Sequence, residues 1–164
     1  MKIRFTKAHG AKNDFLLTWR SDAPEDNLPQ IARAICNRNT GIGADGWMLV
    51  DPAADADADA EGAIELYNSD GSAPELSGNG TRCAAAFLIW RGSAPARVRI
   101  RTGAGIKTLR MLSRSQLKFE FEMNMGRARI VETRFNLPLS SGARASWPAA
   151  RSRWPASAPR SRSA

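Results

Sequence analysis

The fold of this chain is decided by the stretch Tyr67-Asn68-Ser69-Asp70-Gly71-Ser72-Ala73-Pro74-Glu75-Leu76-Ser77-Gly78-Asn79-Gly80-Thr81-Arg82-Cys83. Its Asn, Ser, Asp and Gly residues are typical of a turn that follows a short apolar strand over 63–67. Residues 81–91 predict a helix that is apolar nearly all round, so we expect it to be buried. The Ser-Gly-Asn-Gly before this helix leaves backbone N–H groups bare at the positive end of the helix dipole, which suits a carboxylate or phosphate. The alternative is a plain glycine turn before a core helix.

The rest of the chain up to residue 139 reads as short strands with one further helix. Alternating apolar residues predict strands, and a second helix is expected over 28–38. A turn at 9–12, with Gly10 placed for tight geometry, joins the first two strands. The fold class is therefore α+β, with a mostly antiparallel or mixed sheet wrapped around one buried central helix. The predicted strands cover 2–8, 13–19, 47–50, 63–67, 97–102, 106–112, 117–123 and 128–133.

Two glycine-rich or acidic segments resemble known sites but do not fit them. Residues 41–46 match the spacing G-x-G-x-x-G, yet a helix precedes them and a strand follows, the reverse of the order in a dinucleotide-binding unit. Residues 52–61 alternate Ala with Asp, which is typical of a solvated loop rather than a cation site. We therefore expect neither a nucleotide cofactor nor a bound metal.

Composition bounds the remaining possibilities. No run approaches the roughly 20 apolar residues that a membrane span needs, and the N-terminus lacks a signal-peptide core, so the expected compartment is the cytoplasm. Cys36 and Cys83 both lie in apolar helical contexts and do not suggest a disulfide. Of the net charge of +8, residues 140–164 contribute +5, which leaves only +3 for residues 1–139.

The last 25 residues, 140–164, differ from the rest of the chain. They include seven Ser, seven Ala, five Arg and three Pro, without Ile, Leu, Val, Phe or an acidic residue. Such a segment cannot bury enough apolar surface to fold, so we expect a disordered tail. Its Trp and Arg residues could stack on single-stranded nucleic acid, but an out-of-frame translation product explains the composition better.

Four motifs, in this order and spacing, resemble the N-terminal half of diaminopimelate epimerase: His9-Gly-Ala-Lys-Asn13-Asp14-Phe15, Thr40-Gly-Ile-Gly-Ala-Asp45-Gly46, Tyr67-Asn68-Ser-Asp70-Gly71-Ser72 and Gly78-Asn79-Gly80-Thr-Arg82-Cys83. The resemblance covers residues 2–139. It implies an enzyme of lysine biosynthesis that interconverts LL- and meso-diaminopimelate without pyridoxal phosphate or metal. The implied fold has two similar domains, each of which supplies one cysteine to the cleft between them.

The resemblance also implies the site residues of this chain. Asn13 and Asn68 are expected to bind the polar ends of the substrate, and Gly78 and Asn79 to hold its α-carboxylate. Ser77 stands where the family has its first catalytic cysteine. A hydroxyl is a far weaker acid than a thiol, and no His or Lys in this motif is placed to activate it.

Activity is a separate question, because the family's second domain is absent from this sequence. We expect residues 1–139 to form the N-terminal domain alone and the chain to be inactive by itself as a truncated or frameshifted product. The small-molecule partner is an amino acid, and the domain is a candidate for homodimer formation. The alternatives are another racemase or dehydratase of the same fold with a proline-like substrate, or a non-catalytic binding module with a basic tail.

Overall fold

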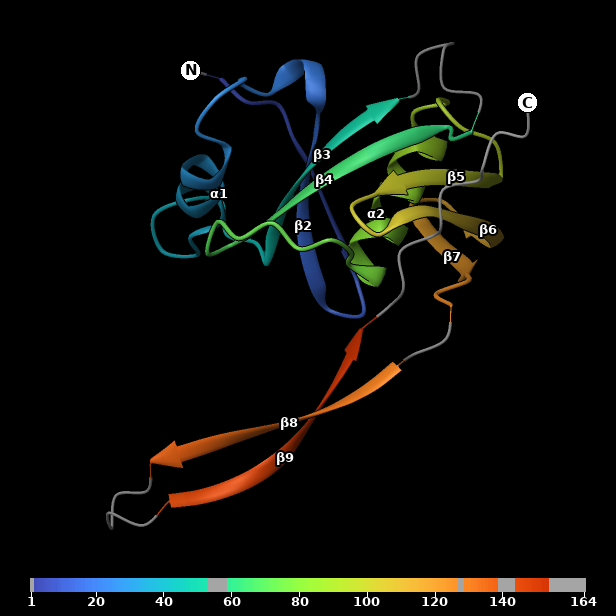
Figure 1. The fold of residues 1–164 in the computed structure, drawn as a ribbon. Helices are drawn as coiled ribbons and strands as arrows, with labels where there is room; N and C mark the ends of the chain where they lie inside the picture. Colours follow the sequence, from blue (N-terminus) through green and yellow to red (C-terminus); the bar gives the residue numbers. More distant parts are fainter. Residues whose placement is uncertain (1, 53–58, 127–128, 139–143, 154–164) are drawn as a thin grey trace, which may run out of the picture.

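The computed structural model describes residues 2–52, 59–126, 129–138 and 144–153 (Figure 1). Two α-helices and seven strands form its main body, and two further strands form a separate hairpin. The helices are α1 (Leu28–Cys36) and α2 (Gly78–Trp90), and a 3-10 turn η1 covers Arg20–Asp22. The strands are β1 (Thr6–Gly10), β2 (Asn13–Trp19), β3 (Gly46–Pro52), β4 (Gly62–Asn68), β5 (Arg97–Thr102), β6 (Gly105–Ser115), β7 (Lys118–Met123), β8 (Arg129–Pro138) and β9 (Arg144–Arg153).

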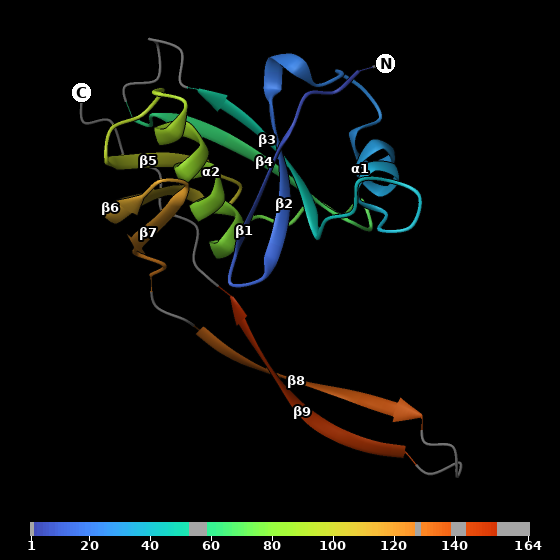
Figure 2. The same ribbon diagram turned by 180° about the vertical axis from the view of Figure 1, so that it is seen from behind.

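The main sheet is mixed, and its strand order β1-β2-β3-β4-β5-β6-β7 follows the chain. The pairs β2–β3 and β4–β5 are parallel, because α1 and α2 respectively return the chain to the starting end of the sheet; the other pairs are antiparallel. The sheet curls into a half-barrel around α2, with α1 on the other side (Figures 1 and 2). The structure confirms the predicted fold class.

Both faces of β2 and β3 are buried, which explains their nearly continuous apolar sequences. Phe15 and Leu17 of β2 pack toward α2 in the larger of two apolar clusters, while Leu16 packs toward α1 in the smaller one. On β3 the same alternation sends Met48 to the α2 cluster and Trp47 to the α1 cluster. The central strands are therefore the layer shared by the two cores.

The turn between β1 and β2 corrects the expectation for Gly10. Gly10 ends β1 and pairs with Asn13, so the two-residue turn consists of Ala11 and Lys12, with φ of 52° and 68°. A two-residue hairpin turn with positive φ at both positions normally uses Asn or Gly, because a Cβ is crowded there. Gly10 instead faces Asn79 of α2: a Cβ at Gly10 would lie 3.5 Å from the Asn79 carbonyl oxygen.

We predict that Lys12→Gly stabilises the domain by about 0.5–1 kcal/mol, because glycine accepts the left-handed conformation that lysine is forced to adopt. Urea unfolding measures the change. Lys12→Ala is the control: it keeps the Cβ and therefore the strain, and should give no such gain. Equal effects of glycine and alanine would mean that the turn stores no strain.

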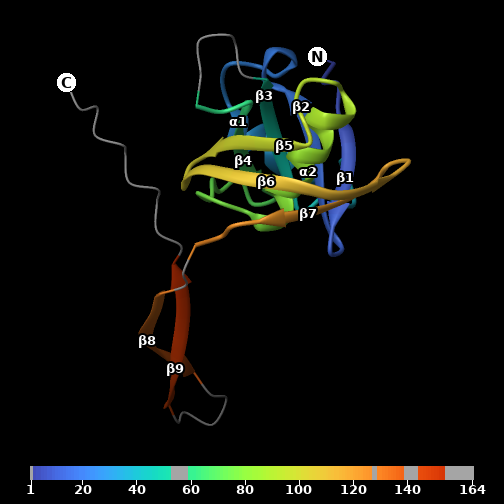
Figure 3. The same cartoon turned by 90° about the vertical axis from the view of Figure 1, so that its right-hand side faces the viewer.

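The hairpin β8–β9 pairs Arg129–Pro138 with Arg144–Arg153 and extends away from the main sheet (Figure 3). β8 includes the strand expected over 128–133, except for residue 128, which lies outside the described residues. β9 falls within the segment 140–164 that the sequence predicts to be disordered; the remainder of that segment, 140–143 and 154–164, lies outside the described residues. Disorder was predicted because this segment has few apolar side chains. Backbone hydrogen bonds between paired strands do not depend on apolar side chains, so the strand over 144–153 can form without them.

Neither helix of the described chain is long and apolar enough to cross a membrane.

Candidate functional site

Three neighbouring strand ends bring the first and third motifs together. Phe15 of β2 is the register partner of Gly46 on β3, and Gly46 is the partner of Asn68 on β4. Side chains two residues apart on a strand share a face, so Asn13 lies on the same face as Phe15, the face that packs against α2. Asn13 and Asn68 therefore flank the start of β3 on the α2 side of the sheet.

Asn13 carries an unsatisfied polar atom. Its amide oxygen Oδ1 is buried and has no hydrogen-bond partner. A buried amide without a partner costs free energy, and the two ends of an amide are both polar, so either orientation leaves a group that requires a partner.

Asn68, unlike Asn13, forms hydrogen bonds within its own loop. Its Nδ2 donates to Ser72 Oγ at 2.9 Å, and its backbone N–H donates to the Ser72 carbonyl oxygen at 2.8 Å. Asp70 accepts from the Ser72 N–H at 2.8 Å and so closes the turn further. Asn68 thus fixes the loop that leads into α2, and it also lies beside the start of β3.

The helix α2 begins at Gly78, three residues earlier than predicted, because Ser77 caps it. Ser77 Oγ accepts a hydrogen bond from the Gly80 N–H at 3.1 Å, and the Ser77 carbonyl accepts from the Thr81 N–H at 2.8 Å. The N–H of Gly80 is therefore not bare. Among the described residues, nothing accepts a hydrogen bond from the N–H groups of Gly78 or Asn79, which leaves two donors at the positive end of α2.

The first turn of α2 is held against the sheet by close contacts. A Cβ at Gly80 would lie 2.6 Å from Met48 Cε, so a glycine lets the helix sit directly over β3. A Cβ at Gly78 would lie 3.4 Å from Met125 Cε, which places that methionine beside the helix start. Asn79 Oδ1 accepts a hydrogen bond from Arg82 Nη2. Together these contacts aim the N-terminus of α2 at the strand ends that carry Asn13 and Asn68.

The two thiols of the chain do not take the place of Ser77. Burial raises the pKa of Cys83, in the second turn of α2, to about 11. Burial also raises the pKa of the Cys36 thiol, at the end of α1, to about 11. Both side chains are therefore neutral thiols near pH 7, and neither is a ready base.

A charged network on the opposite face of β2 fixes the second motif. Asp14 and Asp45 each accept a hydrogen bond from the other's backbone N–H, at 2.9 and 3.1 Å. Arg38 bridges both carboxylates, with its Nη2 2.6 Å from Asp14 Oδ1 and 2.9 Å from Asp45 Oδ1, and Lys7 Nζ lies 3.1 Å from Asp14 Oδ2. Asp14 belongs to the first motif and Asp45 to the second, and neither motif indicates this pairing. Their role here is to fasten the glycine-rich segment 40–46 to the start of β2.

The hydrogen bond from Arg38 holds the pKa of Asp14 far below its usual range, so the network's contribution depends on pH. A carboxylate whose pKa is lower in the folded than in the unfolded protein contributes its full stabilisation at pH values above the unfolded-state pKa of about 3.9. This stabilisation is lost progressively as the pH falls from there toward the folded-state pKa. We predict that Asp14→Asn lowers the free energy of unfolding by about 1–2 kcal/mol at pH 7, and that the difference from wild type narrows toward pH 3.

Urea unfolding at pH 7, 5 and 3 tests this prediction. Asp26→Asn removes an exposed carboxylate that has no ion pair among the described residues, and it serves as the control. A difference between Asp14→Asn and wild type that is the same at pH 3 as at pH 7 would show that the charge of Asp14 is not what stabilises this network.

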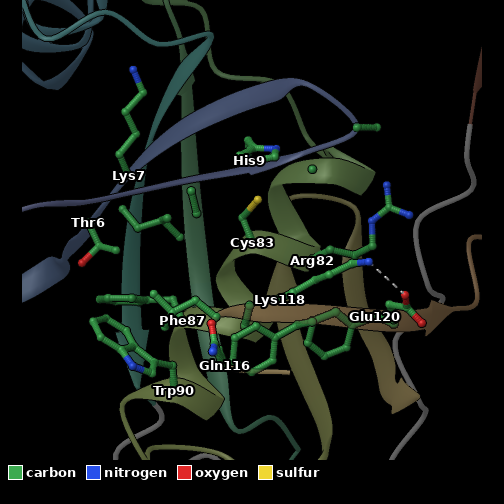
Figure 4. Close-up of a pocket in the computed structure, with 18 of the residues that line it drawn as sticks. Thr6, Lys7, His9, Arg82, Cys83, Phe87, Trp90, Gln116, Lys118 and Glu120 are labelled. Atoms are coloured by element: carbon green, nitrogen blue, oxygen red, sulfur yellow. Dashed lines mark ion pairs between the residues drawn. The ribbon is translucent and has the colours of Figure 1, made fainter. Parts of the chain in front are cut away.

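A separate groove of about 840 Å³ lies between the two edge strands, β1 and β7 (Figure 4). Cys83, Phe87 and Trp90 of α2 line it, with His9 on one side and the Lys118–Glu120 pair on the other. Asn13, Asn68, Ser77, Gly78 and Asn79 do not line this groove. The predicted site residues thus gather at the N-terminus of α2 and not in the groove. No group of three or more His, Cys, Asp or Glu side chains in the described parts of the chain is arranged to hold a metal ion.

Comparison with known proteins identifies relatives of this chain by sequence. The family model described as diaminopimelate epimerase matches residues 5–131. The diaminopimelate epimerase of Synechococcus elongatus is 44% identical over 108 residues, covering 65% of this chain and 38% of that protein. That of Archaeoglobus fulgidus is 41% identical over 112 residues, covering 66% of this chain and 39% of that protein.

Solved structures show the same fold at low identity. A hydroxyproline epimerase from Agrobacterium vitis, solved with bound trans-4-hydroxy-L-proline, aligns with a TM-score of 0.67 at 16% identity, covering 90% of this chain and 48% of that one. A Bacillus anthracis phenazine biosynthesis protein of the PhzF family aligns with a TM-score of 0.57 at 17% identity, covering 80% of this chain and 44% of that one. This chain spans about two fifths of the length of the two epimerases that it matches in sequence.

Proposed function

Because this chain belongs to the diaminopimelate epimerase family, we propose that it carries one half of an epimerase site that binds diaminopimelate, the amino acid whose LL and meso forms such a site interconverts. Residues 1–139 form the domain that carries this half-site, and 140–164 lie outside it. The reaction belongs to lysine biosynthesis in the cytoplasm and needs no pyridoxal phosphate. A homodimer is the assembly we assign to the domain.

One observation carries this proposal: an unpartnered acceptor and unpartnered donors stand at the same place. Asn13 Oδ1 is a buried acceptor without a donor, and the N–H groups of Gly78 and Asn79 are donors without an acceptor among the described residues. A zwitterionic amino acid offers the complement, an ammonium for the acceptor and a carboxylate for the donors. The helix dipole of α2 favours the carboxylate and the negative charge that develops when the α-proton leaves.

Ser77 lies where it would face the reacting carbon, but as a hydroxyl that caps the helix. Its Oγ accepts from the Gly80 N–H, an interaction that would stabilise an ionised oxygen or sulfur at this position. Serine does not ionise near neutral pH, so the half-site binds substrate without removing a proton by itself. We therefore expect no exchange of the diaminopimelate α-proton with deuterium oxide above background, measured by NMR on the 164-residue chain. Exchange above background would overturn this inactivity.

Binding is tested directly by titrating the ¹⁵N-labelled chain with diaminopimelate. We predict shifts of the Gly78 and Asn79 amide signals, and an affinity about tenfold weaker in Asn13→Ala, which loses the buried acceptor. Asn39→Ala, in the exposed turn that follows α1, is the matched control and should bind like wild type. Shifts confined to other residues, or equal affinities in the two variants, would refute the assignment of the site.

The same titration with trans-4-hydroxy-L-proline addresses the alternative substrate class. A linear diamino acid and a cyclic imino acid both carry the carboxylate that α2 attracts, so the donors alone do not distinguish them. We expect diaminopimelate to bind more tightly. Tighter binding of hydroxyproline would move the function to the proline-like racemases and leave the site residues unchanged.

A further inference from the structure

The positive charge of this chain is concentrated in its last part. Residues 127–164 include eight Arg and one Glu, which gives a net charge of +7 out of the total of +8. Residues 1–126 hold 16 Lys and Arg against 15 Asp and Glu, a net charge of only +1. A nearly neutral domain followed by a strongly basic segment is a charge distribution typical of proteins that bind an anionic polymer through that segment.

The described part of the basic segment is the two-stranded ribbon β8–β9, which extends away from the main sheet (Figure 3). Its register pairs run from Arg129 opposite Arg153 to Pro138 opposite Arg144. At about 3.4 Å per residue, the ribbon is about 30 Å long. A ribbon of this kind can lie along a linear partner, as two-stranded ribbons do in proteins that bind nucleic acid.

The register places three arginines together on one face of the ribbon, which we call the arginine face. Arg129 and Arg153 are direct cross-strand partners, and such partners lie on the same face. Arg151 is two residues from Arg153 and therefore lies on this face as well. Glu132, the only acidic residue of the two strands, is three residues from Arg129 and so lies on the other face. The arginine face thus has no acidic residue to neutralise it.

An aromatic pair lies on the same face, farther along the ribbon. Phe135 and Trp147 are cross-strand partners, and Phe135 is six residues from Arg129, an even number that keeps it on the arginine face. Arginines bind the phosphates of nucleic acid, and aromatic rings stack on unpaired bases. A duplex keeps its bases stacked inside, so this combination favours a single strand. Composition alone could not show it, because it does not indicate which residues share a face.

We propose that the arginine face of β8–β9 binds single-stranded nucleic acid. Arg129, Arg151 and Arg153 are the phosphate contacts, and Phe135 and Trp147 form the stacking platform. This binding uses no residue of the amino-acid half-site, so the inference goes beyond the proposed function and does not depend on it.

The first experiment tests the charge, using the full chain and a labelled oligothymidylate whose fluorescence anisotropy reports binding. We expect the triple variant Arg129→Gln, Arg151→Gln, Arg153→Gln to bind about 100-fold more weakly than wild type at about 0.1 M salt, because each lost phosphate contact forgoes the release of about 0.7 counterion. Its plot of log K against log salt concentration should be less steep by about 2. The same three positions changed to lysine keep the charge and should bind like wild type.

A charge-matched control separates the ribbon from net charge. The triple variant Lys2→Gln, Arg4→Gln, Lys12→Gln removes three exposed cations from the main body and should bind like wild type. Equal weakening in the two glutamine triple variants would mean that binding follows net charge alone, and it would overturn the ribbon site. Absence of binding by the wild-type chain would overturn it as well.

The second experiment tests the aromatic pair. We expect Trp147→Ala to bind the oligothymidylate about tenfold more weakly with an unchanged salt dependence, and Trp147→Phe, which keeps a ring, to bind like wild type. Trp90→Ala removes a tryptophan of α2 that is 41% exposed, and it serves as the control. Equal affinities of Trp147→Ala and wild type, or binding to a duplex as tight as to the single strand, would overturn the single-strand assignment.

Discussion

Replacing Ser77 with cysteine is expected to create a thiol that reacts with iodoacetamide at pH 7 about a thousand times faster than either native cysteine. The new Sγ would stand at the cap position of α2, accept the Gly80 N–H and lie at the positive end of the helix dipole. These interactions favour the thiolate and lower its pKa below the ordinary value of about 8.5. Mass spectrometry of the peptides gives the rate at each cysteine separately.

The chain supplies its own controls for this experiment. Cys36 and Cys83 are buried, and burial raises the pKa of each thiol to about 11, so both remain protonated at pH 7. Ser93→Cys places an exposed thiol just beyond the opposite, negative end of α2. If the thiol of Ser77→Cys titrates at the same pH as that of Ser93→Cys, the cap and the dipole do not activate position 77.

Gly41→Ala is expected to lower the free energy of unfolding by about 3 kcal/mol or more, which corresponds to a fall in Tm of roughly 6–12 °C. A Cβ at Gly41 would lie 2.2 Å from the Ala34 carbonyl oxygen and 2.7 Å from the Ile35 carbonyl oxygen. Both neighbours are backbone atoms of α1, so neither can turn away as a side chain would. The loop must move, and it then loses the hydrogen bonds that Ile42 and Gly43 donate to Ile35.

Gly92→Ala separates this steric effect from the general cost of replacing a glycine. Gly92 has a φ of 73° with nothing within 4 Å of an added Cβ, so alanine there meets conformational strain alone. We expect a loss of about 1 kcal/mol, measured by urea unfolding under the same conditions. A loss at Gly41 no larger than at Gly92 would mean that the loop 40–46 adapts to the added methyl group.

The segment around Gly41 shows which features could be predicted from the sequence and which could not. The order of elements around 41–46, a helix before and a strand after, is visible in the hydrophobic pattern, and the structure has the same order. The contact of Gly41 with α1 is not visible, because it depends on how a loop folds back over the end of a helix. Alternation likewise predicted the strands well, yet it could not show that β2–β3 and β4–β5 are parallel, since one strand pattern suits either direction.

Some features of the candidate site could likewise be predicted from the sequence, and others could not. The motifs led to Asn13, Asn68 and the start of α2, and the structure brings these residues to one end of the sheet. Three features could not be predicted from the motifs. Ser77 caps the helix, Asn68 Nδ2 donates a hydrogen bond to Ser72 Oγ, and Lys107 is buried. A lysine within an alternating strand looks like a solvated residue until the register assigns its face.

The identity of sheet order and chain order has a consequence for how this domain folds. Every strand from β1 to β7 pairs with its neighbour in sequence, so no pairing waits for a distant segment to arrive. Loop closure therefore spans at most one helix with its flanking loops at each step, and folding rates fall with the separation of contacting residues. By the end of β4 the nascent chain already holds four paired strands and α1. The half-barrel can grow in the order in which the ribosome releases its strands.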